Sequence, residues 1–102
     1  MESSILDREF SKATFKVCIS LPNLDKVLID KPVAFIKATQ YYHRREPVDK
    51  IFMCKNESGS ITARDLVNCL IKNKYCHNPY ECRFLETFTV DDDGVVIPFF
   101  GS

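Results

Sequence analysis

The sequence lacks tryptophan, has only three glycines and carries no net charge, because fourteen basic residues balance fourteen acidic ones. A balanced charge removes the long-range field that draws a protein onto a nucleic-acid backbone or an anionic membrane. So few glycines leave no glycine-rich loop to cradle a phosphate. The chain also lacks an apolar run of the roughly 18 to 20 residues that span a bilayer. The composition therefore argues against a membrane partner and against an enzyme built on a phosphate-binding loop.

The five cysteines are the next constraint, since their number is odd and no Cys-x2-Cys pair occurs. The first ten residues, MESSILDREF, show no basic segment followed by an apolar one, as a secretory signal would. We therefore expect reduced cysteines in an intracellular compartment, cytoplasmic or nuclear. Because 45% of the 102 residues are hydrophobic, residues 1–102 are expected to form a single domain whose core needs no cofactor.

The N-terminal part predicts one strand after a less regular segment. Residues 1–12 are mixed and polar, and we expect either a loosely held arm or a short helical turn. Three apolar residues would pack in such a turn: Ile5, Leu6 and Phe10. Residues 14–21 alternate between apolar and polar side chains, as in a strand with one face on the core. The apolar set consists of Phe15, Val17, Ile19 and Leu21.

The middle of the chain contains one ambiguous segment and one clear strand. Residues 27–42 follow neither the helical nor the strand period, and Pro32 is compatible with a helix start. The run Val33-Ala34-Phe35-Ile36 is equally compatible with a strand, which we favour. Residues 50–54 predict a short apolar strand, and the polar residues 56–60 then supply a turn.

The clearest element is a helix over residues 63–73. Thr62 with Asp65 three residues later resembles a capping box, and apolar residues follow at helical spacing. These residues are Ala63, Leu66, Val67, Leu70 and Ile71. Asn73 suits the end of the helix because asparagine tolerates the left-handed conformation.

Two further strands complete the predicted fold. Residues 84–90 alternate, residues 95–100 are apolar, and the Asp-Asp-Asp-Gly turn between them predicts a hairpin. Pro98 cannot donate to a strand ladder, so the last strand is expected at a sheet edge or leaving the sheet at that residue. Together these elements predict an α+β fold, with a mostly antiparallel sheet of four to five strands and one principal helix packed across it.

Around its helix the sequence resembles the Ras-association domains, a branch of the ubiquitin-like β-grasp fold. The likeness spans residues 33–100, and its specific residues are the apolar stripe of the helix with Thr62, Ala63, Arg64 and Asp65. It implies a β-grasp arrangement, in which one helix crosses a sheet made from two hairpins. It also implies a binding module without catalysis that docks a small GTPase by extending a sheet across the interface. Members that bind GTPases usually carry basic residues on the second strand, whereas residues 51–54 here are apolar.

The stretch KYCHNPYEC, residues 74–82, raises the question of a metal site. With one residue of the helix it supplies four ligands of the types that zinc prefers: Cys69, Cys76, His77 and Cys82. A small zinc-stabilised module is therefore one alternative, although adjacent side chains such as Cys76 and His77 diverge in most backbone conformations. We favour a helix end and a turn in which Cys76 and His77 lie exposed. The negative end of a helix does not favour the thiolate that a catalytic cysteine needs.

The main hypothesis is a non-enzymatic protein-interaction or adaptor module that binds another protein or itself. Aromatic and arginine side chains dominate many interfaces, and the apolar C-terminal strand must be covered by the core or by another molecule. Self-association through that strand, as a homodimer, is one form of this function. The candidate interaction residues are Tyr41, Tyr42, Arg44, Arg45, Val96, Phe99 and Phe100. The second alternative is a nucleic-acid-binding domain that uses His43, Arg44, Arg45 and Lys50.

Overall fold

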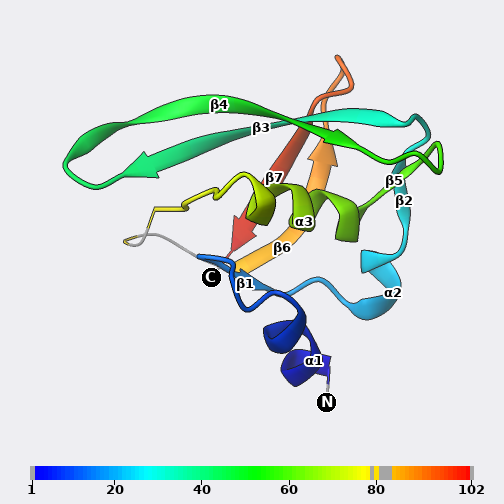
Figure 1. Ribbon diagram of the computed structural model, residues 1–102, viewed down its shortest axis with the longest axis horizontal. Helices are drawn as coiled ribbons and strands as arrows, with labels where there is room; N and C mark the ends of the chain where they lie inside the picture. Colours follow the sequence, from blue (N-terminus) through cyan, green and yellow to red (C-terminus); the bar gives the residue numbers. More distant parts are fainter. Residues whose placement is uncertain (1, 79, 81–83, 102) are drawn as a thin grey trace.

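The computed structural model describes residues 2–78, 80 and 84–101, and its strands form two sheets (Figure 1). The larger sheet has the order β1 (Lys16–Val17), β6 (Phe84–Val90), β7 (Val96–Gly101), β3 (Val33–Tyr42) and β4 (Arg45–Lys55). The smaller sheet pairs β2 (Val27–Ile29) with β5 (Ile61–Thr62). The described residues also form three helices: α1 (Glu2–Glu9), α2 (Leu21–Leu24) and α3 (Ala63–Lys72). None of these helices has both the length and the apolar character that a membrane crossing requires.

Two antiparallel hairpins, β3–β4 and β6–β7, make up most of the larger sheet. Parallel pairs complete it, since β7 pairs with β3 at Ile36 and Val96, and β1 pairs with β6. The predicted α+β class is confirmed. The mostly antiparallel sheet is not confirmed, because the sheet is mixed. Local patterns predict each hairpin, but they do not show how distant hairpins join.

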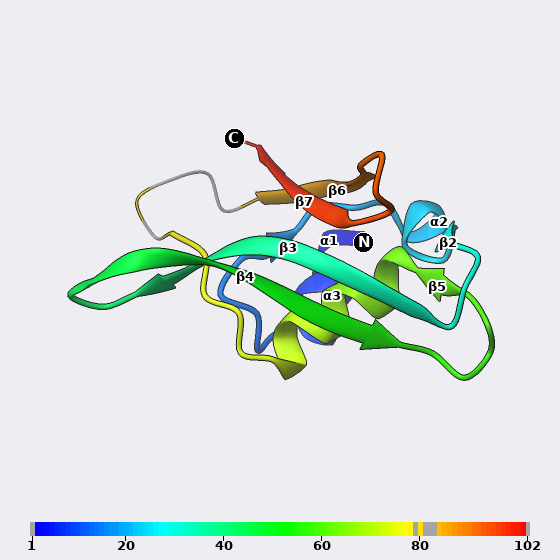
Figure 2. The ribbon, with the colours of Figure 1, turned by 90° about the horizontal axis from the view of Figure 1, so that it is seen from above.

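Helix α3 lies against one face of this sheet. It lies in front of β6 and β7, while the β3–β4 hairpin passes above it (Figure 1), and the second view agrees (Figure 2). The buried side chains of α3 belong to the same core as Ile36, Leu85 and Val96, which are fully buried. Burying a side chain of this size stabilises the fold by about 1.5–3 kcal/mol. The core is therefore the space between α3 and the inner face of the sheet.

The ambiguous segment 27–42 is extended in both of its parts, β2 and β3, so the favoured strand interpretation is confirmed. β4 is longer than the predicted strand over 50–54, because it begins at Arg45. The predicted helix over 63–73 is confirmed to within one residue. Its end differs in one respect: Asn73 has a φ of −86°, and Lys74 takes the left-handed conformation with a φ of 56°.

The N-terminal residues pack on the domain. Residues 2–9 form α1, and Leu6 and Phe10 are buried in the core, as the helical alternative predicts. Ile5 differs from that prediction, because it is exposed.

The strand predicted over residues 14–21 is short. Phe15, Val17 and Ile19 are buried as the alternation predicts, but only Lys16–Val17 pairs as a strand. The chain turns into α2 at Leu21, with Pro22 in the first turn, where its missing N–H leaves no hydrogen bond unmade.

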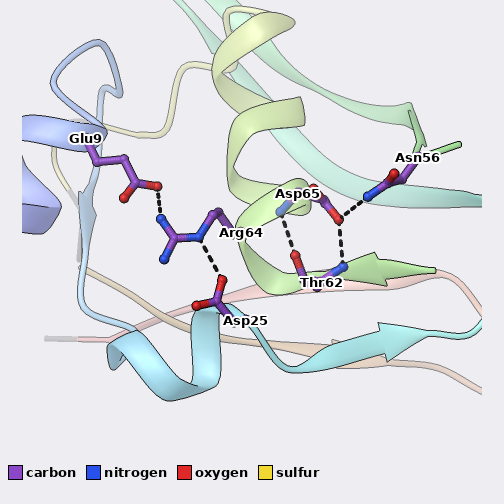
Figure 3. Close-up of polar contacts among 6 residues, drawn as sticks. All are labelled: Glu9, Asp25, Asn56, Thr62, Arg64 and Asp65. Carbon is purple, nitrogen blue, oxygen red and sulfur yellow. Dashed lines mark hydrogen bonds and ion pairs between the residues drawn. The ribbon is translucent and has the colours of Figure 1, made fainter. Parts of the chain in front are cut away.

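Hydrogen bonds fix the start of α3 (Figure 3). The Asp65 N–H donates to Thr62 Oγ1 over 3.2 Å, and the Thr62 N–H donates to Asp65 Oδ2 over 3.0 Å, which completes the capping box. Asn56 Nδ2 donates to the same carboxylate over 2.8 Å and so ties the turn after β4 to the helix. Burial disfavours the charged carboxylate, but these hydrogen bonds outweigh it and lower the pKa of Asp65 below its ordinary 3.8.

Arg64 connects α3 to the N-terminal part of the chain (Figure 3). Its guanidinium donates to Glu9 at the end of α1 and, over 3.0 Å, to Asp25 after α2. Because all three side chains are partly exposed, each ion pair contributes only about 0–1 kcal/mol. Thr62, Arg64 and Asp65, on which the family resemblance rests, therefore all hold the helix in place.

Candidate interaction surface

The β3–β4 hairpin exposes apolar side chains on the face turned away from α3. Ile36 and Phe52 face inward and are buried, whereas Phe35, Ile51 and Met53 are 46, 64 and 50% exposed. The register places Phe35 directly opposite Met53, and Ile51 shares their face two residues along β4. Cross-strand neighbours of this kind have Cβ atoms about 4.5–5.5 Å apart. The three residues thus form one exposed apolar group, called the outer cluster below.

β4 is also an open edge of the sheet. Among the described strands it pairs with β3 alone, and the hairpin reaches beyond the rest of the fold (Figure 1). An open edge presents a row of backbone N–H and C=O groups that can pair with another chain. Pro47 interrupts this row near the hairpin tip, and the Met53 carbonyl accepts from Cys69 Sγ of α3 over 3.4 Å, whereas residues 48–52 between them contain no proline. The outer cluster therefore adjoins an edge that can accept a strand.

The predicted aromatic and basic residues gather near the hairpin tip. The half-buried Tyr42 ring lies 5.2 Å from Arg45 Cζ and 5.3 Å from Lys50 Nζ, within the range of cation–π contacts. Arg44 lies in the turn between the strands with a φ of 60°. The residues of the basic alternative are all exposed there: His43, Arg44, Arg45 and Lys50.

The C-terminal candidates separate into three environments. Val96 is fully buried, so its side chain belongs to the core and not to a surface. Phe99 is 53% exposed and faces outward opposite Thr87. Phe100 is half-buried and stacks on His77 with ring centroids 3.8 Å apart. Of the predicted C-terminal set, Phe99 is the residue whose side chain faces outward.

β7 is not an edge strand, because it lies between β6 and β3. Its pairing with β3 nevertheless stops at Val96. Alternate residues of a strand bond to the same neighbour, so the next residue of β7 to bond β3 would be Pro98, which has no N–H to donate. The edge prediction is wrong. The alternative, that the strand leaves the sheet at Pro98, is not confirmed either, because β7 separates from β3 after Val96 but stays paired with β6 as far as Gly101.

A cleft of about 390 Å³ opens where β3 and β7 separate, and it is called the β3–β7 cleft below. Its lining includes Lys37, Tyr41, Tyr75, His77, Ile97 and Phe100. Among the predicted interaction residues, the structure therefore brings Tyr41 and Phe100 together here, apart from the cluster around Tyr42.

Residues 75–77 border this cleft. The Tyr41 N–H donates to the Cys76 carbonyl over 2.9 Å, and the Cys76 N–H donates to the buried side chain of Gln40 over 3.3 Å. Cys76 and His77 are therefore half-buried, and their interpretation as an exposed turn is wrong. The reason is the separation of β3 from β7, which the sequence around Cys76 does not reveal.

Tyr75 forms the inner wall of the cleft. Its ring lies 6.0 Å from those of Phe15 and Phe52, and its hydroxyl is 3.0 Å from His77 Nδ1. Burial, with a smaller contribution from Cys76, raises the pKa of Tyr75 to about 12. The phenol therefore stays protonated at neutral pH, and the wall offers apolar and hydrogen-bonding groups without a charge on Tyr75.

The zinc candidates are not gathered in the described part of the chain. Cys69 lies on α3 with its sulfur 3.4 Å from the Met53 carbonyl of β4, whereas Cys76 and His77 border the β3–β7 cleft. Cys82 lies outside the described residues. Within the described ranges, no group of three or more His, Cys, Asp or Glu side chains is placed to hold a metal ion.

Comparisons with protein-family models, with curated proteins and with solved structures find no match to the chain.

The sequence prediction missed the outer cluster, although a signal for it was present. Strand alternation assigns Phe35 to one face of β3 and Ile36 to the other, and it separates Phe52 from Ile51 and Met53 in the same way. Once Ile36 and Phe52 are placed in the core, the other three must face outward.

Proposed function

We propose that the chain is a non-enzymatic protein-interaction module that binds its partner along β4. The partner adds a strand to the open edge and covers the outer cluster. The observation that carries this proposal is that one strand pair has both an edge with no partner strand among the described residues and three exposed apolar side chains on its outer face. In such strand addition the backbone hydrogen bonds supply affinity, while the side chains of the added strand give specificity.

Charge around the outer cluster indicates the chemistry of the partner. Lys37 lies opposite Ile51 across the hairpin, and strand alternation puts the exposed Lys55 and Asp49 on the same face, Lys55 beyond Met53 and Asp49 before Ile51. A partner surface with an apolar centre and acidic groups opposite Lys37 and Lys55 would complement this arrangement.

We also propose that the fold is a β-grasp. Its support is the strand order β4-β3-β7-β6, in which the first and last strands of the two hairpins are parallel neighbours and α3 connects the hairpins. In the Ras-association domains that the chain resembles, docking extends a sheet. Here β4 would be the second strand of that fold, and its exposed apolar centre differs from the basic second strand of members that bind GTPases.

The hairpin tip supports a second candidate function, nucleic-acid binding. The exposed Arg45 and Lys50 lie over the Tyr42 ring, and cations beside an aromatic ring suit a single-stranded backbone and a stacked base. Such binding would weaken steeply as salt rises, because phosphate contacts release counterions. Binding to a single-stranded oligonucleotide that is absent at low salt, or insensitive to salt, would eliminate this candidate.

The main proposal is tested with a charged variant and a matched control. Ile51→Lys/Met53→Lys places two charges in the outer cluster, and Thr87→Lys/Thr89→Lys places two on β6, where both threonines are exposed. Crosslinking and affinity purification from cell extract are expected to recover proteins with the wild type and the control but not with the β4 variant. Circular dichroism melts confirm that both variants are folded. Recovery of the same proteins with both variants would contradict the proposal.

A further inference from the structure

Two buried cysteines, Cys54 of β4 and Cys69 of α3, meet between the strand and the helix. Cys54 Sγ donates to the Asp65 carbonyl over 3.6 Å, and Cys69 Sγ donates to the Met53 carbonyl over 3.4 Å. Asp65 and Cys69 lie about one turn apart on the same face of α3, and Met53 immediately precedes Cys54. These reciprocal contacts bring the two cysteines side by side, close enough for each thiol to influence the other electrostatically.

Cys54 and Cys69 both line a surface pocket of about 420 Å³. The residues are only 4 and 8% exposed, but the pocket admits a small reagent to the wall that they help to form. The rest of its lining is largely polar and includes Lys55, Asn68, Lys72 and Asn73. The pair is therefore sheltered from large molecules and open to small polar ones.

The two thiols have different surroundings. The neighbouring Cys69 thiol, together with burial, raises the pKa of Cys54. The neighbouring Cys54 thiol lowers the pKa of Cys69. Asn73 Nδ2, 3.6 Å from the Cys69 sulfur, and the charge of Lys72 act in the same direction, against burial. Thiolate character is therefore concentrated on Cys69, and Cys54 is its protonated neighbour.

We propose that Cys54 and Cys69 are a redox pair that closes to a disulfide when the protein meets hydrogen peroxide. The Cys69 thiolate attacks one peroxide oxygen, the O–O bond breaks, and Cys69 becomes a sulfenic acid while hydroxide takes up a proton. Cys54 then loses its proton and attacks the Cys69 sulfur, the S–O bond breaks, and water leaves. Two thiols are oxidised by two electrons, and one peroxide is reduced to two waters.

The disulfide would join the edge strand β4 to the helix that covers the inner face of the sheet. It closes a loop through the turn at 56–60 and the capping box, so it restricts the unfolded chain and raises the melting temperature. A link between oxidation and partner binding rests on the proposed function of β4. The chemistry of the pair does not, because it is measured without a partner.

The first experiment uses a variant that retains only the two cysteines of the pair: Cys18→Ser/Cys76→Ser/Cys82→Ser. The folded protein is treated with one equivalent of peroxide, then denatured in the presence of iodoacetamide so that every remaining thiol is blocked, and weighed by mass spectrometry. We expect a monomer that has lost two hydrogens, carries no alkyl group and becomes fully alkylated after dithiothreitol. Alkylation of both cysteines, under conditions that oxidise a thiol peptide in the same tube, would overturn the proposal.

The second experiment tests the roles of the two sulfurs with dimedone, which traps sulfenic acids. In the variant that retains only Cys54 and Cys69, the further change Cys54→Ser removes the resolving thiol, so a dimedone adduct is expected on Cys69. Cys69→Ser removes the attacking thiol, and no adduct is expected on Cys54. A dimedone adduct on Cys54 but not on Cys69 would overturn the assigned roles. A disulfide that forms no faster in the native protein than in urea would contradict the proposal that the fold holds the two thiols ready to react. Melts establish that both serine variants are folded.

Discussion

The two faces of the β3–β4 hairpin carry similar residues in opposite environments. Ile36 and Phe52 face the helix and lie in the core, whereas Phe35, Ile51 and Met53 face away from it and remain exposed. Packing within the chain accounts for the inner set. It does not account for the outer set, which is the reason to propose a partner for that face. Apolar composition of a strand therefore does not by itself identify a core strand.

The largest effect on stability is expected from truncating a residue on the inner face of β3, and its comparison is a truncation on the outer face. Ile36→Ala should lower the free energy of unfolding by about 2–5 kcal/mol, because it removes a fully buried side chain and leaves a cavity. Its neighbour Phe35 is half-exposed, so Phe35→Ala should cost about 0.5 kcal/mol or less. Urea denaturation measures both values. Similar losses for the two variants would remove the distinction between the faces.

A smaller effect is expected from loosening the helix that covers the inner face. Thr62→Ala removes the hydroxyl that accepts the Asp65 N–H at the start of α3, and it should cost about 1 kcal/mol. Ser58→Ala is a control, because Ser58 is an exposed residue of the preceding turn. Thermal melts compare the two. A Thr62→Ala protein as stable as the control would mean that the capping box does not stabilise the helix.

Acid should weaken the same helix start. The pKa of Asp65 is lower in the folded protein than its ordinary 3.8, so below that pH the unfolded chain binds more protons than the folded one. The stabilisation is therefore complete above pH 3.8 and is lost as the pH falls through the lowered pKa. Asp65→Asn removes this titration. The stability difference between wild type and Asp65→Asn should shrink between neutral pH and pH 3, and a constant difference would contradict the prediction.

The helix start and the β3–β7 cleft show what sequence reasoning can reach. The capping box and the apolar stripe lie within residues 62–71, so a local pattern contains all the information that specifies α3. The cleft depends on a pairing between Ile36 and Val96, and on Pro98, which ends that pairing. The packing of Cys76 and His77 follows from these distant residues, and no local pattern predicts it.

The faces of β3 illustrate an intermediate case. Alternation separates Phe35 from Ile36, but hydrophobicity alone does not say which side faces inward. The inward side also carries Ala34 and Ala38, which are small and buried. Small side chains allow a helix to approach a sheet closely, so the side with less apolar bulk became the core side. This outcome depends on where α3 lies, which is a property of the whole fold.

The smallest effect on the molecule itself is expected from two substitutions on its outward side, and it separates two interaction surfaces. Ile51 lies on the open edge strand, whereas Phe99 lies on the central strand β7, and both side chains are more than half exposed. Ile51→Ser and Phe99→Ser should each change the free energy of unfolding by about 0.5 kcal/mol or less. Size exclusion with light scattering then measures self-association, and affinity purification from cell extract measures partner binding. If association is lost with Ile51→Ser alone, the β4 surface is supported, because of these two strands β4 is the one with an unpaired edge beside its exposed side chain. Loss with Phe99→Ser alone would instead support association through the C-terminal strand, and it would leave the outer cluster without a role.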